Sequence, residues 1–361
     1  MNPLSTASAP PAPMPTPLAA LPVPIVAPEA LLEHRGVRTA AFFDGFEAET
    51  EALFYGASVH DLGWLRQVCI KGSDGTRWLN GMVTNAVQTL KPDEGNYNFL
   101  LNAQGRILGD LEVWNQSLLT LTLDANQHDT LLEHLNHFII MDDVELHEVC
   151  GTTALGLTGP GAPALLTALG LPAPAAMQSA DALLDEMQVE VYRRHSAVVP
   201  HFELWVAEEE VGALWTRLQG AGARAAGVQA LEALRIVEGI PAYGRDILAT
   251  DLPQETSQIH ALSFTKGCYL GQEIVERIHS RGSVHRHIRQ FELRGGIPAL
   301  PTAIFQDGKS IGELTSAIKV AIQGKEHVFA LGHLRDEALL SQQPLEYEEG
   351  TATVVNTAPL L

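Results

Sequence analysis

Two stretches of the chain follow the same plan, in which a strand-like segment ends in a glycine-rich turn and continues into a helix. In the first, Trp64–Ile70 is followed by a helical segment at Thr76–Val83; in the second, Thr153–Leu157 is followed by Pro163–Leu169. Each is followed by more strand-like segments and by a strand that runs into an amphipathic helix. Such a repeat predicts two α/β halves packed about a pseudo-two-fold axis, with a ligand in the cleft between them.

The two ends of the chain differ from this repeat. From Arg286 the segments are short, alternate between apolar and polar residues, and are separated by Gly, Pro and Asp, which predicts a small antiparallel β-barrel over 286–361. Residues 1–28 are rich in proline and read as a disordered tail. We therefore expect an α+β chain with a tail, two intertwined domains over 29–285, and a barrel.

Charge and cysteine content exclude several classes of protein. The 361 residues include 23 Lys+Arg and 43 Asp+Glu, a formal net charge of −20, so direct nucleic-acid binding and association with anionic membranes are not expected. No apolar run is long enough for a transmembrane helix, and prolines interrupt the one stretch, Leu18–Val26, that resembles a signal sequence. The three cysteines form no CxxC pair, so we expect a cytoplasmic protein without a metal site.

The segment Phe264–Arg277 carries the most chemical information. It places Cys268 between Gly267 and Gly271, which let a ligand or backbone approach closely, and Lys266 stands two residues away, where it could favour the thiolate. A small buried hydrophobe is the alternative reading of this cysteine.

A cluster of cations follows that segment in an otherwise acidic chain. Its pattern fits either a solvated face or a site for an anionic ligand or partner, because Arg presents a planar fork to carboxylate and phosphate groups. The cluster consists of Arg277, His279, Arg281, His285, Arg286, His287, Arg289 and Arg294.

The octapeptide Lys266–Glu273 resembles the signature of the YgfZ-type folate-binding proteins, a branch of the glycine-cleavage T-protein (GcvT) superfamily whose mitochondrial relatives assist iron–sulfur cluster assembly. The resemblance covers nearly the whole chain from about residue 55 and includes three further groups of motif residues, at 79–85, 101–111 and 239–255. It implies a tetrahydrofolate-binding accessory protein for the maturation or repair of iron–sulfur proteins, including tRNA-modifying enzymes. Its partners would be iron–sulfur enzymes or assembly factors, and Cys268 and Lys266 would be catalytic residues.

The same resemblance assigns a folate pocket. Tyr97 matches an aromatic residue of the pocket, Asp110 the catalytic carboxylate, Glu203 the carboxylate that grips the pterin ring, and Arg235 and Tyr243 further pocket residues. These residue types suit the ligand, because a carboxylate can accept the N–H edge of a pterin and a flat ring needs aromatic walls.

Each pocket residue also has a purely structural interpretation. Asp110 could be a turn or capping residue, and Glu203 could point outward from a half-exposed strand. Arg235 could pair with Glu232 or Glu238, and the two tyrosines could be ordinary core residues.

Two other functions remain open from the sequence. A folate-dependent aminomethyltransferase would use Asp110 as general base, but residues 197–201 lack the Tyr- and acid-rich turn of the transferases, which also generally lack the cysteine. A non-catalytic β-barrel module for RNA or an acidic partner is the third, and it depends on the Arg cluster.

Overall fold

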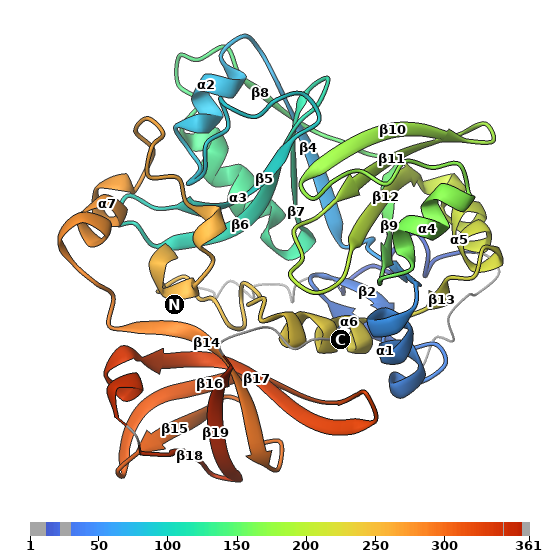
Figure 1. Cartoon of the computed structure of the whole chain (residues 1–361). Coiled ribbons are helices and arrows are strands. Elements are labelled where there is room, and N and C mark those ends of the chain that lie inside the picture. The colour runs from blue at the N-terminus through green and yellow to red at the C-terminus, as the bar shows by residue number, and fades with distance from the viewer. Residues whose placement is uncertain (1–11, 22–29, 342, 356–361) are drawn as a thin grey trace, which may run out of the picture.

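The computed structural model describes residues 12–21, 30–341 and 343–355. Its first half is a five-stranded sheet with two helices (Figure 1). The elements are β4 (Leu65–Lys71), α2 (Gly75–Asn80), β5 (Gly95–Leu101), β6 (Ile107–Asn115), β7 (Leu119–Asp124), α3 (Ala125–His137) and β8 (Glu145–Glu148).

The second half repeats this plan with a six-stranded sheet. Its elements are β3 (Ser58–Asp61), β9 (Thr152–Thr158), α4 (Ala162–Ala168), β10 (Gln178–Leu184), β11 (Met187–Arg193), β12 (His201–Ala207), α5 (Val211–Gly220) and β13 (Arg224–Ala225).

The order of strands confirms the predicted duplication. The first sheet runs β5-β6-β7-β4-β8 and the second runs β10-β11-β12-β9-β3-β13, so each strand of the first has a counterpart in the second. The two halves also exchange a strand: β3 precedes the first half in sequence but pairs with β9, whereas β8 precedes the second half but pairs with β4. The sheets meet where β5 and β10 begin, at a bridge between Glu94 and Gln178.

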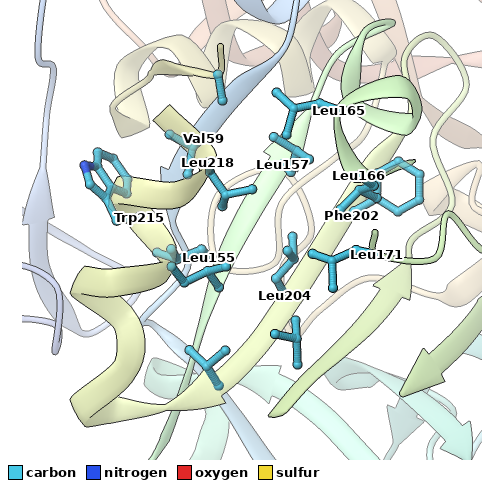
Figure 2. Packing of buried hydrophobic residues seen from close by; sticks show 14 of the residues in the cluster. Val59, Leu155, Leu157, Leu165, Leu166, Leu171, Phe202, Leu204, Trp215 and Leu218 are labelled. Carbon is cyan, nitrogen blue, oxygen red and sulfur yellow. The ribbon is translucent and has the colours of Figure 1, made fainter. Parts of the chain in front are cut away.

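The core of the second half lies between its sheet and the helices α4 and α5 (Figure 2). Leu155 and Leu157 of β9 and Phe202 and Leu204 of β12 are fully buried there, because alternate residues of a strand point to the same face. Trp215 of α5 closes the cluster.

Part of the segment that we expected to be a disordered tail packs into this core. Residues 1–11 and 22–28 of that expectation lie outside the described residues, but residues 12–21 are placed. Leu18 is 1% exposed and belongs to the core of the second half. The backbone N–H of Thr16 donates to the carbonyl of Arg38, and its hydroxyl donates to buried Asp61. Proline restricts the backbone, but the interspersed apolar residues still find a place to be buried.

The hairpin β1 (Leu31–His34) and β2 (Val37–Ala40) and the helices α1 (Phe46–Tyr55) and α6 (Val228–Glu238) complete the region between the halves. A buried carboxylate, Glu49 of α1, holds this region together. It accepts the N–H groups of residues 43–45 and, at 2.8 Å, that of Gly227 at the start of α6. Donors at a helix start need such acceptors, because no turn precedes them.

After α7 (Gln272–Arg281), the C-terminal strands form a closed antiparallel barrel, as predicted. Three of the strands are longer than the short segments in the sequence suggest, because paired strands continue through their polar, solvent-facing positions. The strands are β14 (Arg286–Gly295), β15 (Thr302–Gln306), β16 (Lys309–Ile322), β17 (Lys325–Arg335), β18 (Leu345–Tyr347) and β19 (Gly350–Val355).

Helix α6 lies between the halves and the barrel (Figure 1). Its buried residues share one core with α1 and with residues of β16 and β17 such as Val320 and Phe329. We propose the domain division at about residue 285, just before β14. Among the described residues, no helix has the length and apolar character that crossing a membrane requires.

Candidate functional site

A cavity of about 160 Å³ opens between the two halves, above α6. That is roughly ten times the space one water molecule needs by the same measure. Its wall combines the β1–β2 turn, the strands β5 to β7, the residues after β11, and α6 with the loop that follows it. Of the pocket residues implied by the resemblance, Tyr97, Asp110, Arg235 and Tyr243 line it.

Tyr97 and Asp110 form a hydrogen-bonded pair on neighbouring strands. The register pairs Tyr97 with Glu112 and Phe99 with Asp110, so all four side chains point to one face. The hydroxyl of Tyr97 donates to Asp110 Oδ2 at 2.7 Å, and Gln127 of α3 donates to Oδ1 at 2.8 Å. Burial raises the pKa of Asp110, and these two hydrogen bonds only partly oppose it. The carboxylate is therefore positioned and poised to hold a proton.

Two more carboxylates from the first sheet line the cavity. Glu112 follows Asp110 by two positions on β6, and Asp124 ends β7. Asp124 is neutralised by Arg35 of the β1–β2 turn, whose Nη1 donates to both of its oxygens at 2.8 and 3.0 Å.

Glu112 is paired with Arg194, which directly follows β11. Arg194 Nε donates to Glu112 Oε1 at 2.7 Å and lies 3.3 Å from Glu203 Oε1. Burial alone would lower the pKa of Arg194, but the charges of Glu112 and Glu203 outweigh it and keep the guanidinium protonated.

Glu203 itself lies behind Arg194 rather than on the cavity wall. Its side chain is 0% exposed, and Trp205 Nε1 donates to Oε2 at 3.2 Å. Burial raises the pKa of Glu203 to about 7, although Arg194 lowers it. The interpretation of Glu203 as an outward-pointing strand residue is therefore wrong.

One wall of the cavity is made of flat rings. The Tyr97 and His260 rings are 5.4 Å apart between centroids, and His195 lies 4.5 Å from His260 on its other side. Burial, together with the neighbouring His195, lowers the pKa of His260 to about 4, so this ring is neutral at physiological pH. A wall of this kind suits a flat heterocycle.

Arg235 of α6 and Tyr243 of the loop that follows it also line the cavity. Arg235 donates from Nε and Nη2 to Glu232, from Nη1 to Asp246 and the carbonyl of Ile240, and from Nη2 to Ser316. Its guanidinium is thus committed to the protein, with Glu232 as one of the two partners considered from the sequence. Burial raises the pKa of the half-buried Tyr243.

Lys266 and Cys268 lie outside the cavity. Lys266 Nζ donates to the carbonyls of Val83 and Asn85 at 2.6 and 2.7 Å, so the ammonium holds the preceding motif rather than the thiol, contrary to the expectation that it favours the thiolate. Burial lowers the pKa of Lys266 to about 7. Cys268 is exposed, which excludes the buried-hydrophobe reading.

The loop that carries Cys268 is fixed by close packing. Gly271 has φ = 81°, and a Cβ there would lie 2.6 Å from the carbonyl oxygen of Asn102. The N–H of Leu270 donates to the carbonyl of Gly81 at 3.0 Å. Three of the motifs singled out in the sequence therefore meet around one exposed thiol.

The Arg cluster does not act as one site. Arg286 pairs with Asp251 and Glu255 beneath the barrel, and His287 pairs with Asp336 at 2.7 Å. Arg277, Arg281 and Arg294 are exposed to solvent. In the described part of the chain, no group of three or more His, Cys, Asp or Glu side chains could hold a metal ion.

Arg194, Glu112 and the histidines of the cavity were not among the pocket residues expected from the sequence. A signal for Glu112 was present: Asp110 and Glu112 stand two apart in an otherwise apolar strand, and acids at that spacing share one buried face. Arg194 and His195 gave no comparable signal, because they follow a strand end where charged residues are ordinary.

The family model described as the GCVT N-terminal domain matches residues 24–266. Among curated proteins, the chain is 26% identical over 298 residues to an aminomethyltransferase of Geobacillus kaustophilus, covering 79% of this chain and 81% of the relative. It is 24% identical over 326 residues to a putative chloroplastic transferase of Arabidopsis thaliana, covering 88% and 74%.

The fold is similar to that of a solved structure. The crystal structure of glycine cleavage system aminomethyltransferase T from Bartonella henselae matches with a TM-score of 0.81 and 20% sequence identity, covering 92% of this chain and 94% of that one. The match includes the barrel, since it extends over almost the entire length of both chains.

Proposed function

The chain belongs to the GCVT N-terminal domain family, and from this premise we propose that it binds tetrahydrofolate in the cavity between its halves. Several similar curated proteins are named aminomethyltransferases, and the resemblance of the sequence motifs implies tetrahydrofolate as the ligand. The observation that carries the proposal is the cavity itself, which sets a wall of rings from Tyr97 and His260 beside buried carboxylates.

The side chains of the cavity fit a pterin. Glu112 lines the cavity, and its Oε2 is buried and accepts no hydrogen bond from any described residue; the same holds for Oε1 of Glu203, which lies behind Arg194. Buried polar atoms without partners are costly, so a ligand edge with N–H donors would be stabilised there. Tyr97, His260 and His195 supply the flat wall that the ring needs.

Asp110 gives the site a proton-handling group. When bound, tetrahydrofolate supplies nitrogen atoms that carry a one-carbon unit. Asp110 is held by Tyr97 and Gln127, and burial raises its pKa, so it takes up a proton more readily than an exposed carboxylate does.

We further propose that the protein assists the maturation or repair of iron–sulfur proteins, including tRNA-modifying enzymes. The motif Lys266–Glu273 and its exposed thiol support this role. Because Cys268 lies outside the cavity on a fixed loop, it is available to a second macromolecule while folate occupies the cavity. Iron–sulfur enzymes or their assembly factors would then be the partners.

A folate-dependent aminomethyltransferase is the second candidate, and Asp110 together with the names of the curated relatives favours it. A glycine-cleavage assay separates the two: a transferase releases ammonia from an aminomethyl-lipoyl carrier protein, and Asp110→Asn abolishes that release. A protein that binds tetrahydrofolate but releases no ammonia fits the accessory role.

Titration calorimetry with tetrahydrofolate tests the binding proposal. Tyr97→Leu removes a flat ring and also the hydrogen bond to Asp110, so it should weaken binding at least about 10-fold, as stacking alone contributes on the order of 1–3 kcal/mol per ring. Tyr55→Leu, on the exposed side of α1, is the matched control. Equal affinities for both variants, or no binding by the native chain, would place the folate site elsewhere.

A further inference from the structure

Arg194 differs from Arg235, an arginine of the same cavity, in its free hydrogen-bond donors. Its Nε donates to Glu112, but Nη1 and Nη2 donate no hydrogen bond to any described residue. Its side chain is 29% exposed and lines the cavity. The guanidinium of Arg235, by contrast, uses all three of its nitrogens within the protein. Arg35 donates from Nη1 alone, but both oxygens of its partner Asp124 already accept from it.

Acceptors without partners stand beside this free fork. Glu112 Oε2 and Glu203 Oε1 accept no hydrogen bond from the described residues, although Glu112 Oε1 is bound to Arg194 Nε. Arg194 and Glu112 both line the cavity, so free N–H donors and a carboxylate with an unpartnered oxygen stand next to each other on its wall. A ligand group that satisfies both must carry an acceptor next to a donor.

The local charge decides whether that group is anionic or neutral. One guanidinium already faces two carboxylates, at 2.7 Å and 3.3 Å. Like charges that are brought close together in a partly buried site repel each other more strongly than they do in water. A third carboxylate from the ligand would be repelled by both glutamates, whereas a neutral carbonyl meets only the attraction of the Arg194 fork.

We infer that Arg194, with Glu112 beside it, recognises a neutral ring edge in which a carbonyl stands next to an N–H, the lactam edge of a pterin. This inference rests on the proposed folate function and names the residue that sets its ring specificity. In an analogue with an amino group in place of the ring carbonyl, the N–H groups of that amino group face the N–H groups of Arg194. Its donors and those of Arg194 then both lose their partners, which is the kind of mismatch that gives strong discrimination.

The test compares tetrahydrofolate with tetrahydroaminopterin, which differ only in that the ring carbonyl is replaced by an amino group. Both are titrated into the full chain by calorimetry at mildly alkaline pH, where the diamino ring carries no added proton. The carbonyl form should bind at least about 100-fold more tightly. Affinities within about 3-fold of each other overturn the inference while the folate site stands, whereas no binding of either compound removes both.

A variant then assigns the discrimination to Arg194. Arg194→Gln offers the ring an acceptor as well as a donor, so the preference should shrink to about 10-fold or less. Arg194→Lys keeps the positive charge between the two glutamates if the Gln variant fails to fold, and should also lose most of the preference because it lacks the planar fork. Arg217→Gln, an exposed residue of α5, is the control. An unchanged preference in a folded Arg194 variant contradicts the assignment.

Discussion

At the scale of single residues, the charged side chains around the cavity differ in whether their hydrogen bonds are already made within the protein. Arg235 donates its hydrogen bonds to other residues of the protein, so it stabilises the cavity wall. Arg194 and Glu112 keep unpaired atoms on the cavity wall, so some of their hydrogen bonds are still to be made. Glu203, behind Arg194, is the most costly carboxylate to bury, because it has lost its hydration and only Arg194 and the N–H of Trp205 compensate for that loss.

The cost of burying Glu203 predicts a particular dependence of stability on pH. The pKa rises from 4.5 to about 7 on folding, chiefly through burial, so the folded state binds the extra proton between these values. Stability is therefore greatest below the unfolded pKa and falls as pH rises through the window, by roughly 3 kcal/mol from this group.

The variant Glu203→Gln should remove that contribution. Its free energy of unfolding, measured with urea at a series of pH values, should fall less across the window than that of the native chain. Glu209→Gln, exposed in the short turn that follows β12, should behave like the native chain. Parallel curves for the native chain and Glu203→Gln would show that Glu203 keeps an ordinary pKa.

Cys268 belongs to a different part of the molecule, and its variant should separate two roles. Cys268→Ser should keep the fold and the affinity for tetrahydrofolate, because the thiol is exposed and lines no part of the cavity. It should nevertheless fail to restore the activity of an iron–sulfur enzyme in cells that lack the native protein. Cys150→Ser, which alters the second exposed cysteine, should restore it. Full rescue by both variants would reject the iron–sulfur role of the thiol.

The residues of the site differ in how far the sequence could place them. The motif around Asp110 and the position of Tyr97 were enough to expect them at one pocket, and both lie on the cavity wall. Their roles toward folate stay predictions. The ammonium of Lys266, expected to act on Cys268, donates to the carbonyl of Val83, a residue far away in the sequence, and no local pattern indicates such a contact.

At the scale of elements, the segment 12–21 acts as a strap across the second half. Its backbone joins the β1–β2 hairpin through Arg38, and Leu18 fills the core behind β9 and α5. Thr16 also hydrogen-bonds to Asp61 at the end of β3. The segment thereby connects the hairpin that carries Arg35 with the sheet below it.

Leu18→Ala should lower the free energy of unfolding by about 2–4 kcal/mol, the cost of a cavity in a closed core. Met14→Ala provides the comparison within the same segment, since Met14 is 76% exposed and should change stability by less than about 0.5 kcal/mol. Chemical denaturation measures both. A loss below about 1 kcal/mol for Leu18→Ala would mean that the strap is loosely held in solution.

The elements that could be predicted from the sequence are those with a local signal in it. Glycine turns marked the entry into α2 and α4, and alternation marked the barrel strands. The exchange of β3 and β8 between the sheets carried no such mark, because each is four residues long and its pairing partner lies elsewhere in the chain. Strand exchange is decided by tertiary pairing, which periodicity does not encode.

At the scale of the whole molecule, the barrel is joined to the cavity wall through a buried polar junction. Asp246 is 0% exposed and accepts hydrogen bonds from Arg235 of α6, the N–H of Ala242, and the hydroxyls of Thr315 and Ser316 in β16. Because Arg235 and Ala242 line the cavity, one carboxylate fixes both the position of the barrel and the shape of the site.

Removing that carboxylate should therefore affect stability and binding together. Asp246→Ala leaves the Arg235 guanidinium and two hydroxyls without their acceptor in a buried place, a loss on the order of 3–5 kcal/mol. The wall around Ala242 should loosen as well, so the affinity for tetrahydrofolate should fall in the fraction that remains folded. Asp246→Asn, which keeps one acceptor oxygen, should show both effects at smaller size, and Asp181→Ala on the exposed face of β10 should show neither. If Asp246→Ala lowers stability while the folded protein keeps its native affinity, Asp246 attaches the barrel to the halves but does not determine the shape of the cavity.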